Sequence, residues 1–171
     1  MILEERIVDI AQSFIGQEEL PNNSGFKDPW FEEAMKSVGW EMDQSWCAYF
    51  PKYVWTEAYA DDEETLDLID KYFVGHAVAS FYNFRKSEEF AVRQVPVIGA
   101  IAVWKHGFTM NGHMGIVTSF TTVDFETVEG NTHNEGELEA KEVADRFRML
   151  NMPHAEDAMN LLGFIYTTRL K

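Results

Sequence analysis

The chain has 171 residues, of which 46% are hydrophobic and 14% aromatic, a composition that suits a single folded domain over residues 1–171 and excludes a disordered chain. The 29 acidic residues outnumber the 14 basic ones and give a formal net charge of −15, which argues against nucleic acid or an anionic membrane as partner. The sequence has one cysteine, so an intramolecular disulfide and a cysteine-rich zinc site are excluded.

The N-terminal residues predict a helix instead of a signal peptide. Apolar residues recur at helical spacing over residues 2–15, and Gly16 follows as a stop signal. Glu4, Glu5 and Asp9 occupy the region where a signal peptide carries basic residues and an apolar run. No stretch approaches the roughly 20 apolar residues of a membrane span. We therefore expect a protein that is made in the cytoplasm and stays there unless other machinery moves it.

Helical patterns continue through the first half of the chain. Turn formers dominate residues 20–29, so this segment is expected to be a loop. The patterns that follow predict helices over residues 30–39, 45–60, 61–70 and 77–86. In the second of these helices Ser45 is the expected N-cap, and Pro51 requires either a start nearer to Cys47 or a kink.

The pattern changes after Pro96. Short segments rich in β-branched and aromatic residues, separated by turn residues, predict strands over residues 97–105, 112–120, 125–131 and 161–170. Helices thus come first in the chain and strands follow, an order typical of α+β proteins with antiparallel sheets. We expect N-terminal helices packed on a mostly antiparallel β-sheet.

Cys47 is the candidate nucleophile. A lone cysteine is often an inert core residue, but Cys47 lies at the predicted start of a helix, just after the polar residues 43–45 and Trp46. Backbone N–H groups and the helix dipole at such a position stabilise a thiolate and lower the pKa of the thiol. The position therefore predicts a reactive cysteine if a base lies nearby.

His113 is the candidate base. It lies at the start of a predicted strand between Gly112 and Gly115, whose small size leaves room for a substrate. The other histidines lie in segments that read as loops or ends of elements, where a solvated side chain is the simpler interpretation. The glycine context distinguishes His113 from them.

A hairpin between the second and third predicted strands supplies an acidic partner for the histidine. If this hairpin folds about Thr121, His113 lies opposite Glu129, and paired side chains on one face are about 5 Å apart. A register error of two residues brings Asn131 to the same place, because Glu129 and Asn131 share a face. Either side chain can orient the imidazole, so the pattern predicts a Cys-His-polar triad.

Four segments around these residues, SWCAYF, IGAIAVWK, GHMGIV and VEGNT, occur in this order along the chain. Together they resemble the CHAP amidase/peptidase family, which is related to the NlpC-type peptidases and shares a papain-like fold. The similarity extends to the N-terminal helix, the PNNSG loop and the closing GFI strand, and so touches most of the chain. One departure is the Tyr-Phe-Pro run after the cysteine, where the family usually has small or apolar residues.

The resemblance implies hydrolysis of an amide bond in peptidoglycan. The bond lies either between the glycan and the stem peptide or within the stem and cross-bridge peptides. Carried onto this sequence, the resemblance makes Cys47 the nucleophile and His113 the base. It also makes Glu129 the residue that orients His113, and Asn131 a supporting polar group.

The implied reaction needs an oxyanion hole but no cofactor or metal. The backbone N–H of Cys47 would form part of that hole, with either Gln44 or Ser45 as a second donor. Acidic residues cluster over 61–64, but their spacing does not match an EF-hand loop and indicates a solvated helix start.

Three kinds of protein are compatible with these residues. The first is a peptidoglycan hydrolase: either a phage lysin let through the membrane by a pore protein, which we favour, or an injected antibacterial effector with a cognate immunity protein. The second is a non-catalytic wall-binding or virion module on the same fold, against which the intact Cys47, His113 and Glu129 argue. The third is an enzyme with another substrate, such as a protein deamidase or an amide-forming transferase.

Overall fold

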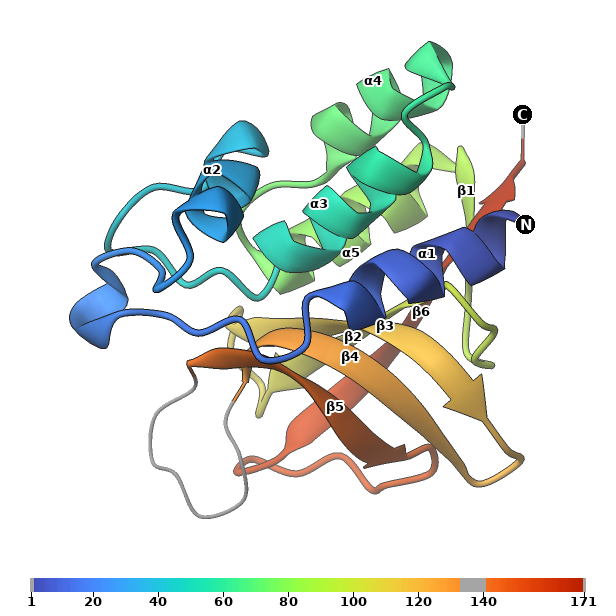
Figure 1. Cartoon of the computed structure of the whole chain (residues 1–171). Helices are drawn as coiled ribbons and strands as arrows, with labels where there is room; N and C mark the ends of the chain where they lie inside the picture. Colours follow the sequence, from blue (N-terminus) through green and yellow to red (C-terminus); the bar gives the residue numbers. More distant parts are fainter. Residues whose placement is uncertain (1, 133–140, 171) are drawn as a thin grey trace.

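The computed structural model describes residues 2–132 and 141–170 (Figure 1). Helices occupy the first half of the chain and strands the second, so the expected α+β class is confirmed. The described elements, in chain order, are α1 (Leu3–Ser13), the 3₁₀ helix η1 (Pro21–Asn23), α2 (Pro29–Ser37), α3 (Tyr49–Ala58), α4 (Glu63–Tyr72), α5 (Ala77–Ser87), β1 (Phe90–Arg93), β2 (Ile101–His106), β3 (Gly112–Phe120), β4 (Asp124–Thr132), β5 (Glu142–Met149) and β6 (Met159–Arg169).

The described strands form one sheet in the order β1-β6-β2-β3-β4-β5, and the pairings between them are antiparallel. Strands β2, β3 and β4 are joined by hairpins, whereas β6 inserts between β1 and β2 and places the C-terminal strand inside the sheet. The segment after α1 covers the first part of β5, where the N–H of Val143 donates to the carbonyl of Gln17 at 2.9 Å. This antiparallel sheet with N-terminal helices is consistent with a papain-like CHAP fold.

The helices lie on one side of the sheet and enclose the main hydrophobic core with it (Figure 1). In α1 the buried residues Ile7 and Ala11 are four positions apart, which places both on the face that packs against α3 and β3. The helices contribute large aromatic side chains to this core, and the sheet contributes branched ones, among them Phe50, Trp55, Phe81, Phe84, Val103, Ile116, Val128 and Ile165.

A second, smaller core lies on the opposite face of the sheet. It contains Ala100, Ala102, Trp104, Val117, Phe125 and Phe164. Because side chains alternate along a strand, His113 shares the face of Val117, and Glu129 shares that of Phe125. The two candidate site residues therefore lie on the face of the second core, at its edge next to the start of α3.

Helices α1, α2, α4 and α5 confirm the predicted helices, but the helix expected over residues 45–60 was wrong at its start. α3 begins at Tyr49 with Ala48 at the N-cap, so Ser45 does not cap it. Pro51 consequently falls in the first turn, where a backbone N–H would have no partner within the helix, so its absence costs no hydrogen bond. No helix among the described residues is long and apolar enough to cross a membrane.

Two strands, β1 and β5, were not predicted, and the strand expected over residues 97–105 begins only at Ile101. A turn with Gly99 in the left-handed region, at φ 79°, precedes β2 and explains the shorter strand. Strands β1 and β5 are the edges of the sheet, and each pairs with one neighbouring strand. They form because a neighbour offers hydrogen bonds, which a local pattern does not reveal.

The acidic run over residues 61–64 forms the start of α4. Asp62 is the N-cap, and its carboxylate accepts a hydrogen bond from the N–H of Thr65 at 3.0 Å. Asp61 and Glu64 are mostly exposed and pair with arginines from other elements. This part of the chain therefore behaves as a solvated helix start, in agreement with the simpler interpretation of its sequence.

Candidate active site

Cys47 lies in the turn that leads into α3. The carbonyl of Trp46 accepts hydrogen bonds from the first two N–H groups of the helix, both at 3.1 Å. Gly130 in β4 lets this turn approach the sheet, since a Cβ atom there would be 2.6 Å from both the Phe50 Cβ and the Trp46 Cζ3. The side chain of Cys47 is buried, with its sulfur 3.7 Å from the carbonyl oxygen of Gly112. Close packing of α3 on β4 thus brings the cysteine to the beginning of β3.

The hairpin between β3 and β4 differs from the prediction in its register. Ile116 pairs with Val128 and Phe120 with Phe125, with a bulge between these two pairs. The turn is therefore centred one to two residues after Thr121. The predicted register was wrong by two residues near the site, because the later turn shifts the pairing by three residues and the bulge between Val117 and Ser119 takes back one.

Glu129 nevertheless reaches His113, because it crosses over Gly115. A shift of two residues leaves the same side chains on the same face. A Cβ atom at Gly115 would lie 2.6 Å from the Cγ of Glu129, so the glycine provides the space through which the carboxylate extends. The Oε2 of Glu129 is 2.8 Å from the Nε2 of His113. The predicted contact is present, although it is diagonal and not direct across the pair.

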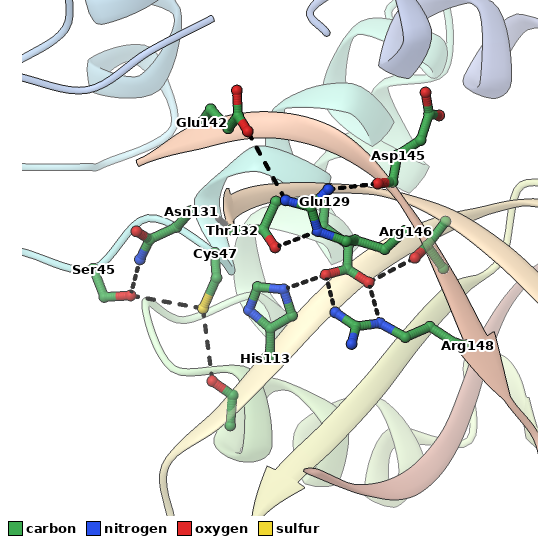
Figure 2. Close-up of polar contacts among 12 residues, drawn as sticks. Ser45, Cys47, His113, Glu129, Asn131, Thr132, Glu142, Asp145, Arg146 and Arg148 are labelled. Carbon is green, nitrogen blue, oxygen red and sulfur yellow. Dashed lines mark hydrogen bonds and ion pairs between the residues drawn. The ribbon is translucent and has the colours of Figure 1, made fainter. Parts of the chain in front are cut away.

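Figure 2 shows Cys47, His113 and Glu129 in a row. Because Nε2 of the imidazole faces Glu129, Nδ1 is the nitrogen left to face Cys47, and in the picture it points to the sulfur. Cys47 and His113 are each 8% exposed, and Glu129 is fully buried. The sheet therefore holds an imidazole between a thiol and a carboxylate with little access for water.

The charges in this row stabilise one another. Burial alone raises the pKa of the Cys47 thiol, but the hydrogen bond and charge of His113 outweigh it and hold that pKa below its usual value. Burial opposes the charged form of His113, whereas Glu129 and Cys47 raise its pKa to about 9. Against burial, His113 and Arg148 lower the pKa of Glu129 to about 2. The arrangement thus favours a thiolate beside an imidazolium over a neutral thiol beside a neutral imidazole.

Asn131 contacts Ser45 and through it the cysteine. Its Nδ2 donates to the Ser45 Oγ at 2.6 Å, and the Ser45 hydroxyl donates to the Cys47 sulfur at 3.7 Å. Asn131 has a left-handed backbone, at φ 55°, and lies where the pairing of β4 with β5 shifts register. This conformation breaks the alternation on which the sequence argument depended, so Asn131 serves the cysteine side of the site instead of replacing Glu129 beside His113.

Two residues that touch Glu129 were missed in the sequence. The Thr127 hydroxyl donates to Oε1 of Glu129 at 2.6 Å. Arg148 in β5 donates through Nε to Oε1 at 2.8 Å and through Nη2 to Oε2 at 2.5 Å. Thr127 had a detectable signal, since it is two residues from Glu129 on the same strand face. Arg148 had none, because β5 was not predicted and its pairing with β4 depends on the tertiary structure.

Gln44 and Ser45, the two alternatives for a second oxyanion donor, have different partners. The hydroxyl of Ser45 is directed to the Cys47 sulfur. The side-chain oxygen of Gln44 accepts hydrogen bonds from the Tyr49 hydroxyl at 2.9 Å and the Glu41 N–H at 3.3 Å. These contacts leave the amide nitrogen of Gln44 as the end of the side chain with hydrogens still to donate.

Two of the cavities lined by the described residues differ in their relation to the site. A hollow of about 370 Å³ adjoins the site and is lined mainly by polar residues, namely Glu19, Leu20, Asn22, Asn23, Ser45, Asn131 and Lys141. A larger and more apolar cavity of about 940 Å³ lies around the β3–β4 turn and the loop before β6 and contains none of the predicted site residues. Of these two cavities, the polar hollow is the one lined by residues of the candidate site, Ser45 and Asn131.

An α+β fold that sets a cysteine at a helix start against a histidine on an antiparallel sheet places this chain in the papain-like class. The family model of the CHAP domain matches residues 38–131, just over half of the chain and a span that contains all four predicted site residues. The chain belongs to the CHAP domain family. CHAP domains are typically hydrolases that act on peptidoglycan, so membership indicates a peptidoglycan amidase or peptidase activity in general. Comparison with curated proteins and with solved structures found no match.

Proposed function

We propose that this protein cleaves an amide bond of peptidoglycan by a cysteine-dependent mechanism, as an N-acetylmuramoyl-L-alanine amidase or as an endopeptidase of the stem or cross-bridge peptides. The observation that carries the proposal is the buried row of Cys47, His113 and Glu129, in which the contact between His113 and Glu129 is 2.8 Å. Family membership supports the substrate, and the row supports the chemistry.

In the first half of the reaction, the Cys47 thiolate attacks the carbonyl carbon of the amide and forms a carbon–sulfur bond. The carbonyl electrons move to the oxygen, which the backbone N–H of Cys47 and the side-chain amide of Gln44 are proposed to stabilise. When this intermediate collapses, the carbon–nitrogen bond breaks and the leaving amine takes the proton from Nδ1 of His113. A thioester on Cys47 and a free amine result.

In the second half, water hydrolyses the thioester. The oxygen of the water attacks the thioester carbonyl while neutral His113 takes a proton from that water. The carbon–sulfur bond then breaks. The products are a carboxylic acid and the Cys47 thiolate, once more beside an imidazolium. Glu129 keeps the imidazole in one orientation and stabilises its charged form at both steps.

We further propose that the protein acts as a phage lysin, made in the cytoplasm and admitted to the wall through a pore protein. Expression with and without an export signal tests the place of action, because cells should lyse only when the protein is exported. An injected effector of the same chemistry is distinguished by an immunity protein that, when co-expressed, protects the exporting cells.

The chemistry is tested on purified peptidoglycan by loss of turbidity and by mass analysis of the released fragments. Wild type should release fragments with new amine ends, and Cys47→Ala and His113→Ala should release none. His154→Ala is a matched control, since His154 is exposed and its imidazole contacts the backbone carbonyl of Leu161, away from the candidate site. The fragment masses separate amidase from endopeptidase.

Two other outcomes would contradict the proposal. Binding to peptidoglycan without cleavage would indicate a non-catalytic wall-binding module. Inactivity on several peptidoglycan types, together with a gain of 1 Da in a protein substrate, would indicate a deamidase on the same scaffold.

A further inference from the structure

Glu129 has a second cationic partner, Arg148, which shares the Oε2 atom with His113. The guanidinium of Arg148 donates two hydrogen bonds to the carboxylate, one to each oxygen, from the edge strand β5 (Figure 2). It also lies over the ring of Trp104, 5.2 Å from the ring centroid. The Trp104 ring faces the His113 ring in turn, with 6.1 Å between centroids. Arg148 thus contacts Glu129 and Trp104, and both of these side chains also contact His113.

The carboxylate of Glu129 has its hydrogen-bonding capacity filled. Oε1 accepts from Thr127 and Arg148, and Oε2 contacts His113 and Arg148. An ionised carboxylate offers about four acceptor sites, and a bidentate guanidinium fixes the plane of the group. Rotation of the carboxylate away from His113 would break at least one contact with Arg148, so the arginine helps to set the direction from which the imidazole is held.

The four side chains also form a row of alternating charge. In the reactive state the order is thiolate, imidazolium, carboxylate and guanidinium, and the charges sum to zero. Cys47, His113 and Glu129 are buried, and an uncompensated charge in a buried site is strongly disfavoured. Without the guanidinium the same state would carry one net negative charge, and a proton retained on Cys47 would relieve it.

We propose that Arg148 is a positioning residue of the reaction, which acts through Glu129 to fix His113 and to balance the charge that Cys47 acquires when it ionises. The proposal depends on the Cys-His mechanism proposed above, but not on the identity of the substrate. Among the described residues, a further titratable group near the row is His106, whose own pKa is lowered by burial and by the charge of His113. His106 adds no negative charge, so Arg148 keeps its role as counter-ion to Glu129.

The test measures the ionisation of Cys47 directly and needs no peptidoglycan. The chain has one cysteine, so the rate of alkylation by iodoacetamide as a function of pH reports on Cys47 alone. In this reaction the thiolate displaces iodide and forms one carbon–sulfur bond. Wild type is compared with Arg148→Gln and Arg148→Met, of which the second keeps an apolar contact with Trp104.

We expect the midpoint of alkylation to move to higher pH by about half a unit to one unit in both variants, because a positive charge has been removed two side chains away. Arg148→Lys should keep the wild-type midpoint of alkylation, since it retains the charge. It should lower the hydrolytic rate, because a lysine cannot make the bidentate hydrogen bonds to Glu129. Arg146→Gln is the matched control: Arg146 lies two residues earlier on β5, contacts Thr132 and Glu142, and should leave the midpoint unchanged.

An unchanged midpoint in folded Arg148→Gln or Arg148→Met, with melting temperature followed in parallel, would overturn the proposal and leave Arg148 a structural role. A shift in Arg148→Lys as large as that in Arg148→Gln would overturn it as well, because the charge would then not be the cause. The expected shifts together with inactivity on every peptidoglycan would support Arg148 and contradict the proposed substrate alone.

Discussion

Replacing Glu129 with glutamine removes one negative charge and keeps the shape of the side chain. In the native site Glu129 and Cys47 together raise the pKa of His113 from its ordinary 6.5 to about 9, against the effect of burial. A buried imidazole that faces a neutral amide and the Arg148 guanidinium has lost most of that support, so its pKa should fall from about 9 to 6.5 or below, because burial still disfavours the charged form. At 1.36 kcal/mol per pKa unit, a fall to 6.5 corresponds to about 3.4 kcal/mol, or roughly 300-fold in the proton transfer from Cys47 to His113.

Alkylation of the single cysteine by iodoacetamide measures this loss. Wild type should react with a midpoint below the ordinary thiol pKa, because His113 holds the pKa of Cys47 down. In Glu129→Gln the midpoint should return to the range of an ordinary thiol or above, since burial is then opposed mainly by the hydrogen bond from Ser45. Hydrolysis of peptidoglycan near neutral pH should fall by about 10-fold to 300-fold in the same variant.

Glu126→Gln is the control for the loss of a carboxylate from β4. Glu126 is exposed, three residues before Glu129, and accepts a hydrogen bond from Ser119. It should leave both the alkylation midpoint and the hydrolytic rate unchanged. The reasoning would be refuted if Glu129→Gln, with a native melting profile, kept the wild-type midpoint, because the charge of His113 would then have another source.

Three further results are expected from the same site. Gly115→Ala places a methyl group against Glu129, which should push the carboxylate from His113 and slow alkylation of Cys47 at neutral pH by at least about 10-fold, with melting temperature followed in parallel; an unchanged rate would mean that the carboxylate keeps its contact with His113 beside the methyl group. Ser45→Ala and Asn131→Ala should raise the alkylation midpoint equally, and the double variant should add nothing, whereas additive shifts would show separate roles. The pKa of Glu129 is lowered from 4.5 to about 2, so the contribution of its charge to stability is present above pH 4.5 and is lost as the pH falls through 2. The difference in the free energy of unfolding by urea between wild type and Glu129→Gln should therefore narrow as the pH falls over that range.

The sequence by itself was sufficient for the class of fold and for naming the side chains that the structure brings together at the candidate site. Helical periodicity predicted α1, α2, α4 and α5, and the change to β-rich segments predicted the central and C-terminal strands. These signals are local, since amphipathic spacing and turn residues act within one element. The contact between His113 and Glu129 was also predictable, because an even error in register keeps both side chains on one face.

Only the tertiary structure decided the details that give the site its chemistry. The edge strands β1 and β5 form because a neighbouring strand offers hydrogen bonds, and with β5 comes Arg148, whose partner is nineteen positions earlier in the chain. The direction of Asn131 depends on a left-handed residue at a register shift, which alternation does not predict. Gly130 has no side chain and so leaves space for the start of α3, and Gly115 likewise leaves space for the side chain of Glu129. Such features depend on contacts between distant segments, and a pattern along the chain carries no information about the space between them.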